Sequence, residues 1–174
     1  MPNPTQKLIS FDGIELLLPP TGISWCCRHD DEVKHINSNE YKSVDVIIET
    51  DDEFIYIEVK NPDHPNAMKF RNRDKCITDF KAGKLDEDIH KKFMDSFLYE
   101  WAESRANKPI KFYLIIGINN LESALLLPRK DALKGKWPFN HPDRPQWTGR
   151  CIRCEVFSFE TWNSKFPDFK ITNV

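Results

Sequence analysis

The sequence lacks any long apolar run and any pattern of a secretion signal. Its longest apolar stretches, such as residues 112–118, are far shorter than the roughly 20 residues that a membrane-spanning helix needs. The N-terminal region has no basic stretch followed by an apolar one. We therefore expect a protein that neither crosses a membrane nor is secreted.

The sequence also lacks a large net charge and a disulfide framework. The formal net charge of −2 provides no global basic field for a polyanion, so any nucleic-acid surface must be a local patch. The five cysteines are an odd number, two of them are adjacent at Cys26 and Cys27, and their spacing does not resemble that of small secreted domains. These features favour a reducing compartment, and we expect the protein to be cytoplasmic.

The length and composition suit one globular domain. The chain has 174 residues, of which 40% are apolar and 12% aromatic, and this is enough to bury a sizeable core. No internal repeat, low-complexity tract or linker divides it. We therefore predict a single domain over residues 1–174.

The clearest local pattern is a β-hairpin. Residues 43–49 and 54–60 are two strand-like runs, and the polar stretch Thr50-Asp51-Asp52 between them is typical of a turn. The other elements that we expect, in chain order, are a turn and short strand in residues 1–20, a helix over 22–37, a short helix within 67–80, an amphipathic helix over 85–103, a buried strand over 110–118, a short helix over 121–133, a loop over 135–149 and an edge strand over 150–159. This order predicts an α/β fold with a mixed central sheet flanked by helices.

Three polar residues of the hairpin form the candidate site. Strand alternation places Glu58 and Lys60 on one face and their apolar neighbours on the other. If the hairpin turns symmetrically about residues 51 and 52, Asp45 pairs with Glu58 across it. Like charges opposed in this way are destabilising unless something compensates them.

A divalent cation would provide that compensation. Mg²⁺ prefers hard oxygen ligands and is commonly held by one or two carboxylates together with phosphate oxygens. We predict that Asp45 and Glu58 hold the metal, that the Val59 carbonyl adds a ligand, and that Lys60 positions water or stabilises charge on a phosphate. The competing interpretation is ordinary, because Glu-x-Lys also occurs by chance on exposed strands.

The two hairpin segments resemble motifs of a known superfamily. Residues 43–48 (SVDVII) followed by residues 55–60 (IYIEVK) are similar to motifs II and III of the PD-(D/E)XK nucleases, and the resemblance covers residues 25–118. It implies a restriction endonuclease-like αβββαβ core, dependence on Mg²⁺ or Mn²⁺, and cleavage of DNA or, less often, RNA. Members serve in restriction, repair, phage defence and mobile elements, and fold-level analogy does not choose among these roles.

Two positions depart from the family pattern. Val44 stands where the namesake proline often lies, which is a common variation. The family's preceding acidic residue lies on the first helix, and Glu32 fits a helical position, whereas Glu40 would point to the opposite face of a continuous strand from Asp45. We therefore favour Glu32 over Glu40 as the fourth catalytic residue.

Basic residues near the hairpin are candidates for phosphate contacts. Those that we predict to bind nucleic acid are Lys69, Arg71, Arg73 and Lys91. Trp137 and Trp147 are candidates either for stacking on unpaired bases or for anchoring their loop in the protein. The expected partner is nucleic acid, DNA in preference to RNA. Many nucleases of this kind form dimers that cut both strands, so a homodimer or a larger complex is a further alternative for this protein.

Two alternatives remain beside the nuclease. Cys151 and Cys154, together with Cys26, Cys27 and His29, are candidates for a zinc site, although alternation along a strand separates the first two sulfurs and favours buried cysteines. The second alternative concerns the whole protein: a nuclease-like scaffold that has lost its chemistry and binds as an accessory subunit of a nucleic-acid-processing complex. The near-neutral net charge suits this reading.

Overall fold

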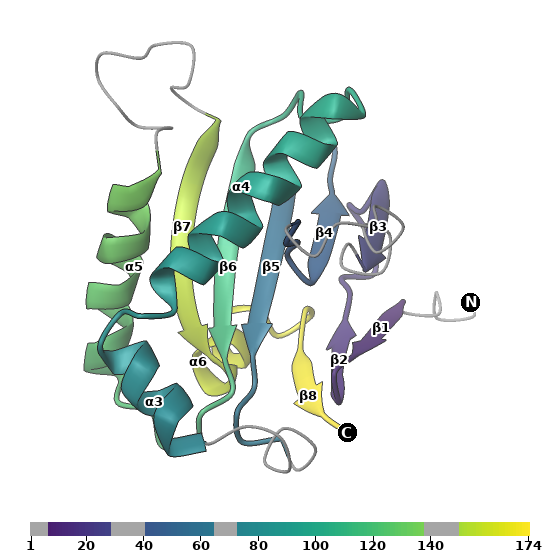
Figure 1. Cartoon of the computed structure of the whole chain (residues 1–174). Helices are drawn as coiled ribbons and strands as arrows, with labels where there is room; N and C mark the ends of the chain where they lie inside the picture. Colours follow the sequence, from purple (N-terminus) through teal and green to yellow (C-terminus); the bar gives the residue numbers. More distant parts are fainter. Residues whose placement is uncertain (1–6, 29–40, 65–72, 138–149) are drawn as a thin grey trace, which may run out of the picture.

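The computed structural model describes residues 7–28, 41–64, 73–137 and 150–174. Within these ranges the protein is mixed α/β, with a five-stranded mixed sheet flanked by helices (Figure 1), so the predicted fold class is confirmed at this level. No helix in the described ranges has both the length and the apolar character to cross a membrane.

The central sheet has the strand order β3-β4-β5-β6-β7. Strands β3, β4 and β5 are antiparallel neighbours, whereas β5, β6 and β7 run parallel to one another. The bounds are β3 Trp25–Arg28, β4 Val46–Glu49, β5 Phe54–Lys60, β6 Ile110–Ile116 and β7 Cys151–Ser158. The expected hairpin, the buried central strand and the edge strand are all present.

Helices connect the parallel strands, and a second small sheet packs against the first (Figure 1). The helices are α3 Arg73–Lys81, α4 Asp86–Ala102, the 3₁₀ turn η1 Ser123–Leu125, α5 Leu126–Lys136 and α6 Phe159–Lys165. The small sheet has the order β1-β2-β8, with β1 Leu8–Phe11, β2 Ile14–Leu17 and β8 Ile171–Asn173. Asp12 and Gly13, at φ 47° and 73°, make the tight turn between β1 and β2.

A separate apolar core lies on each face of the central sheet. On one face, Tyr56 and Phe112 pack with Phe93 of α4 and with residues of α3 and α5. On the other face, Ile57 and its neighbours pack against the small sheet and against α6. The central strands are thus covered on both faces, as near-continuous apolar runs require.

The N-terminal third differs from the prediction. We expected a helix over residues 22–37, but Trp25–Arg28 form β3, because pairing with β4 satisfies their backbone and places Cys27 and Cys26 against opposite cores. The rest of that segment lies outside the described residues. The first twenty residues contain two strands rather than one.

The long helix that we predicted is present, but its buried face does not follow its apolar repeat. The apolar residues Ile89, Phe93, Phe97 and Trp101 recur at fourfold spacing along it. Ile89 and Phe93 are buried, whereas Trp101 is 64% exposed and Glu100 is fully buried. Arg105 compensates that burial, since its Nε donates to Glu100 Oε2 at 2.8 Å. Trp137, one of the two loop tryptophans, is buried in the core, which fits an anchoring role rather than base stacking.

Candidate active site

The hairpin has the register that we predicted for Asp45 and Glu58. The observed pairs, from Glu49 with Phe54 out to Val46 with Ile57, have the register expected from a turn about residues 51 and 52. Asp45 directly precedes β4, where regular pairing has ended. Its Oδ2 accepts a hydrogen bond of 2.7 Å from the Val59 N–H of β5. This bond holds the carboxylate of Asp45 against the neighbouring strand.

Glu58 and Lys60 share the face of β5 that packs under α4. Alternation along the strand puts Tyr56 in the core on this side and Ile57 in the core on the other. The Glu58 side chain is fully buried, and its Oε1 lies 2.7 Å from Nζ of Lys60, which is 16% exposed. Glu58 and Lys60 therefore lie side by side on one face of the strand, as we predicted.

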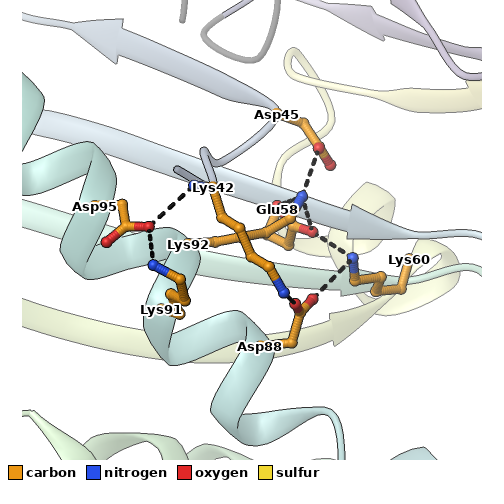
Figure 2. Close-up of polar contacts among 8 residues, drawn as sticks. All are labelled: Lys42, Asp45, Glu58, Lys60, Asp88, Lys91, Lys92 and Asp95. Carbon is orange, nitrogen blue, oxygen red and sulfur yellow. Dashed lines mark hydrogen bonds and ion pairs between the residues drawn. The ribbon is translucent and has the colours of Figure 1, made fainter. Parts of the chain in front are cut away.

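A fourth residue, which the sequence analysis missed, joins the two carboxylates. Lys92 of α4 directs its ammonium between Asp45 and Glu58 (Figure 2). The Lys92 Nζ lies 2.8 Å from Glu58 Oε1, 3.0 Å from Glu58 Oε2 and 3.4 Å from Asp45 Oδ1. The carboxylates thus do not simply oppose each other, because both converge on one cation.

The sequence did carry a signal for Lys92. The buried residues Ile89, Phe93 and Ser96 define the inner face of α4, and Lys92 lies three residues after the first and four before the last. Positions at this spacing share one face of a helix. A lysine on a buried face needs a partner, and the two strand carboxylates provide it.

Asp88 extends the network on the Lys60 side. Its Oδ2 lies 3.9 Å from Lys60 Nζ, and its Oδ1 is paired with Lys42, whose backbone N–H donates to Asp95 at 3.0 Å (Figure 2). Partial burial alone would raise the pKa of Asp88, but Lys42 and Lys60 hold it below the ordinary value. Asp88 is thus an ionised carboxylate beside the acidic pair.

Burial and like charge control the protonation of Asp45. Desolvation, reinforced by the negative charge of Glu58, raises the pKa of Asp45 to about 7, although Lys92 and the Val59 N–H act in the opposite direction. Burial lowers the pKa of Lys92, but Glu58 and Asp45 outweigh this and raise it above its ordinary value. Lys92 is therefore charged at neutral pH.

The donor set suits a hard cation. Asp45 and Glu58 offer carboxylate oxygens that already converge on one ammonium. Within the described part of the chain, no group of three or more histidine, cysteine or carboxylate side chains could hold a metal. A metal held here would therefore need the backbone, water or a substrate phosphate for its remaining ligands, as Mg²⁺ commonly does. The Val59 carbonyl as a ligand stays a prediction.

The other predicted site residues do not join this cluster. Glu32, the alternative Glu40, Lys69 and Arg71 lie outside the described residues. Arg73 pairs with Asp63, so its guanidinium already has a carboxylate partner. Lys91 points away from Lys92 and pairs with Asp95 at 2.6 Å (Figure 2).

The cysteines do not gather either. Cys154 is buried in the core on the α4 side, as the buried-cysteine interpretation predicted. Cys26 and Cys27 pack against opposite cores, so the sheet separates their side chains. His29 lies outside the described residues, and the side chain of Cys151 is not described.

No protein-family model, no curated protein and no solved structure matches the chain. Function must therefore be argued from the chain's own residues. The residues that converge are Asp45, Glu58, Lys60 and Lys92. Lys92 contacts both carboxylates, and Lys60 contacts Glu58.

Proposed function

We propose that this protein is a metal-dependent hydrolase of phosphodiester bonds in nucleic acid, with DNA as the favoured substrate. The observation that carries the proposal is the convergence of Asp45 and Glu58 on a single cation, with the Lys60 ammonium 2.7 Å from Glu58. Paired carboxylates beside a lysine suit Mg²⁺ or Mn²⁺ and a phosphate together.

The strand arrangement supports a restriction endonuclease-like core. The antiparallel strands β3, β4 and β5 are followed by two helices, α3 and α4, and then by β6, which is parallel to β5. This order agrees with the βββαβ part of the core that the resemblance implies. Asp45 lies at the start of the second strand, and Glu58 and Lys60 lie on the third, as in the matching motifs. The helix expected before the first strand is the part that differs.

The chemistry assigns a separate task to each residue. A bound Mg²⁺ or Mn²⁺ would polarise the phosphate and stabilise its negative charge. Asp45 and Glu58 would hold that cation, and Lys60 would orient the attacking water beside the phosphate. The water oxygen would bond to phosphorus as the bond to the bridging oxygen breaks, and one proton of the water would end on the leaving oxygen. The low exposure of Glu58 and Lys60 limits competing solvent at this point.

The test is a cleavage assay over a panel of substrates. Plasmid, linear, single-stranded and branched DNA, together with RNA, are incubated with the protein in Mg²⁺, in Mn²⁺ and in a chelator. We expect metal-dependent products, and losses of about 100-fold or more for Asp45→Asn, Glu58→Gln and Lys60→Met. Lys111→Met is the matched control, since Lys111 pairs with Glu53 at 2.5 Å, away from the site. The proposal is wrong if every substrate stays uncut in both metals, or if all variants cut as fast as the wild type.

One observation favours a second candidate, the accessory scaffold without catalysis. Asp45 and Glu58 already have cationic partners in Lys60 and Lys92, so the two carboxylates are paired without any metal. A protein that had lost its chemistry would keep such a pairing for stability alone. Calorimetry with Mn²⁺ separates the two candidates, because a non-catalytic scaffold should show no heat that depends on Asp45 and Glu58.

A further inference from the structure

The ammonium of Lys92 occupies the place that a metal would need. It lies within 3.4 Å of three carboxylate oxygens, which are Asp45 Oδ1 and both oxygens of Glu58. A Mg²⁺ ion bound to the same oxygens would lie about 2.0–2.1 Å from each of them. The two cations would therefore overlap, so they cannot be bound to this carboxylate pair at the same time.

We propose that Lys92 is an internal cation that closes the acidic pair and must swing away before a divalent metal can bind there. This inference rests on the metal-binding part of the proposed function and adds a means of regulation to it. The lysine keeps Asp45 and Glu58 together when no metal is present, and it lowers the apparent affinity of the site for the metal.

Asp88 is an alternative carboxylate partner for Lys92. It lies four residues before Lys92 on α4, which is the spacing and the order, acid first, at which helix ion pairs form best. Asp88 is 34% exposed and Lys92 is 18% exposed, so a swing from Glu58 toward Asp88 moves the ammonium toward solvent. Lys60 already lies 3.9 Å from Asp88, which shows that a lysine of the site can approach this carboxylate.

A substrate phosphate would favour the same movement. A phosphate that reaches the site offers Lys92 anionic oxygens in exchange for those of Glu58. Metal and phosphate would then each release Lys92 from the carboxylates, so that each strengthens binding of the other, as linkage requires. Divalent ions would therefore bind this carboxylate pair more tightly when nucleic acid is present than when it is absent.

The first test measures Mn²⁺ binding by calorimetry for the wild type, Lys92→Met and the control Lys111→Met. Methionine keeps a similar volume and removes the charge. If Lys92 closes the site in about nine molecules of ten, removing the lysine strengthens the apparent affinity for Mn²⁺ by about tenfold. Lys111→Met should bind as the wild type does, and Asp45→Asn combined with Lys92→Met should lose the gain. An affinity for Mn²⁺ that is unchanged or weaker in Lys92→Met overturns the proposal.

A second test uses the wild-type protein, in case Lys92→Met does not fold. Amine-reactive labelling followed by peptide mass spectrometry reports the accessibility of each lysine. We expect slow labelling of Lys92 in a chelator and labelling at least about threefold faster in saturating Mn²⁺, with Lys111 unchanged in both. Equal rates for Lys92 with and without Mn²⁺ contradict the proposal.

The outcomes separate this inference from the proposed function. If cleavage depends on metal but Lys92→Met binds Mn²⁺ as the wild type does, the inference about Lys92 is wrong and the proposed nuclease function stands. If Lys92→Met binds Mn²⁺ more tightly but no variant cuts any substrate, the inference about Lys92 stands and the proposed nuclease function is wrong. If neither the wild type nor Lys92→Met binds Mn²⁺, the inference fails, and the accessory scaffold is favoured unless the cleavage panel shows metal-dependent products.

Discussion

Lys92 and Glu58 form an ion pair inside the protein, with Nζ 2.8 Å from Oε1 of a carboxylate that has no exposed surface. Burial of two charges costs solvation energy that the attraction between them must offset. Removing one partner leaves the other charge buried without compensation, which is the more damaging change. The pair therefore supports the packing of α4 on β5.

The first prediction concerns the stability of this pair. Lys92→Met should lower the free energy of unfolding by about 3 kcal/mol, because Glu58 and Asp45 then share only Lys60. Glu58→Gln should also destabilise, and the double variant should lose less than the sum of the two single changes. Urea unfolding in a chelator measures all three variants. Strictly additive losses would contradict the idea that the two residues act as a pair.

The second prediction concerns pH. The pKa of Asp45 is about 7 in the folded protein, above the value of about 3.9 in an unfolded chain. The contribution of Asp45 to stability is therefore fully present below about pH 3.9 and is lost as the pH rises through about 7. Asp45→Asn cannot ionise, so its stability relative to the wild type should rise between about pH 4 and about pH 7 and then level off. Unfolding curves in a chelator test this, and parallel pH profiles would contradict it.

The third prediction has the opposite pH dependence. Asp63 accepts from the Asn119 N–H at 2.7 Å and from Arg73 at 3.1 Å, and its side chain is 3% exposed. Although burial acts to raise it, these bonds hold the pKa of Asp63 below its ordinary value. Asp63→Asn should cost about 1–3 kcal/mol near neutral pH.

That cost should shrink as the pH falls below about 4, since the wild-type carboxylate is then protonated as well. Asp74→Asn is the control, because the Asp74 side chain is 92% exposed and lies 3.8 Å from the same arginine. We expect a change within about 0.5 kcal/mol for the control. Equal losses for both variants in urea unfolding would show that Asp63 is merely a surface charge.

The fourth prediction tests Trp137 as the anchor between α5 and the sheet. Its ring stacks on Phe93 with centroids 4.4 Å apart and meets Phe112 edge-on at 5.1 Å. Trp137→Ala should cost about 3–5 kcal/mol through the cavity that it leaves. Trp137→Phe should cost less, since the indole Nε1 is buried without a hydrogen-bond partner among the described residues.

Trp101 supplies the comparison for Trp137. It is 64% exposed on α4, so Trp101→Ala should change stability by no more than about 0.5 kcal/mol. Urea unfolding followed by circular dichroism measures both tryptophans without relying on their fluorescence. If Trp101→Ala lowers the free energy of unfolding as much as Trp137→Ala does, the prediction that the exposed ring adds little stability is wrong.

Local patterns in the sequence determined the hairpin and the part of the site that lies on it. Alternation over β5 and the polar turn before it were enough to predict the register and the shared face of Glu58 and Lys60. The amphipathic repeat predicted α4, and the apolar run predicted β6. Each of these features depends on neighbours within one or two turns or strands, so the sequence alone carries them.

Only the tertiary structure decided the contacts between helices and strands that are distant in the sequence. Four-residue strands such as β3 fit two periodicities equally well, and long-range pairing with β4 selected one of them. The joining of β8 to β2 depends on contacts across most of the chain. The spacing along α4 indicates that Lys92 lies on the inner face of the helix. Its contacts with Asp45 and Glu58 depend on the packing of α4 on β5, which involves the whole core.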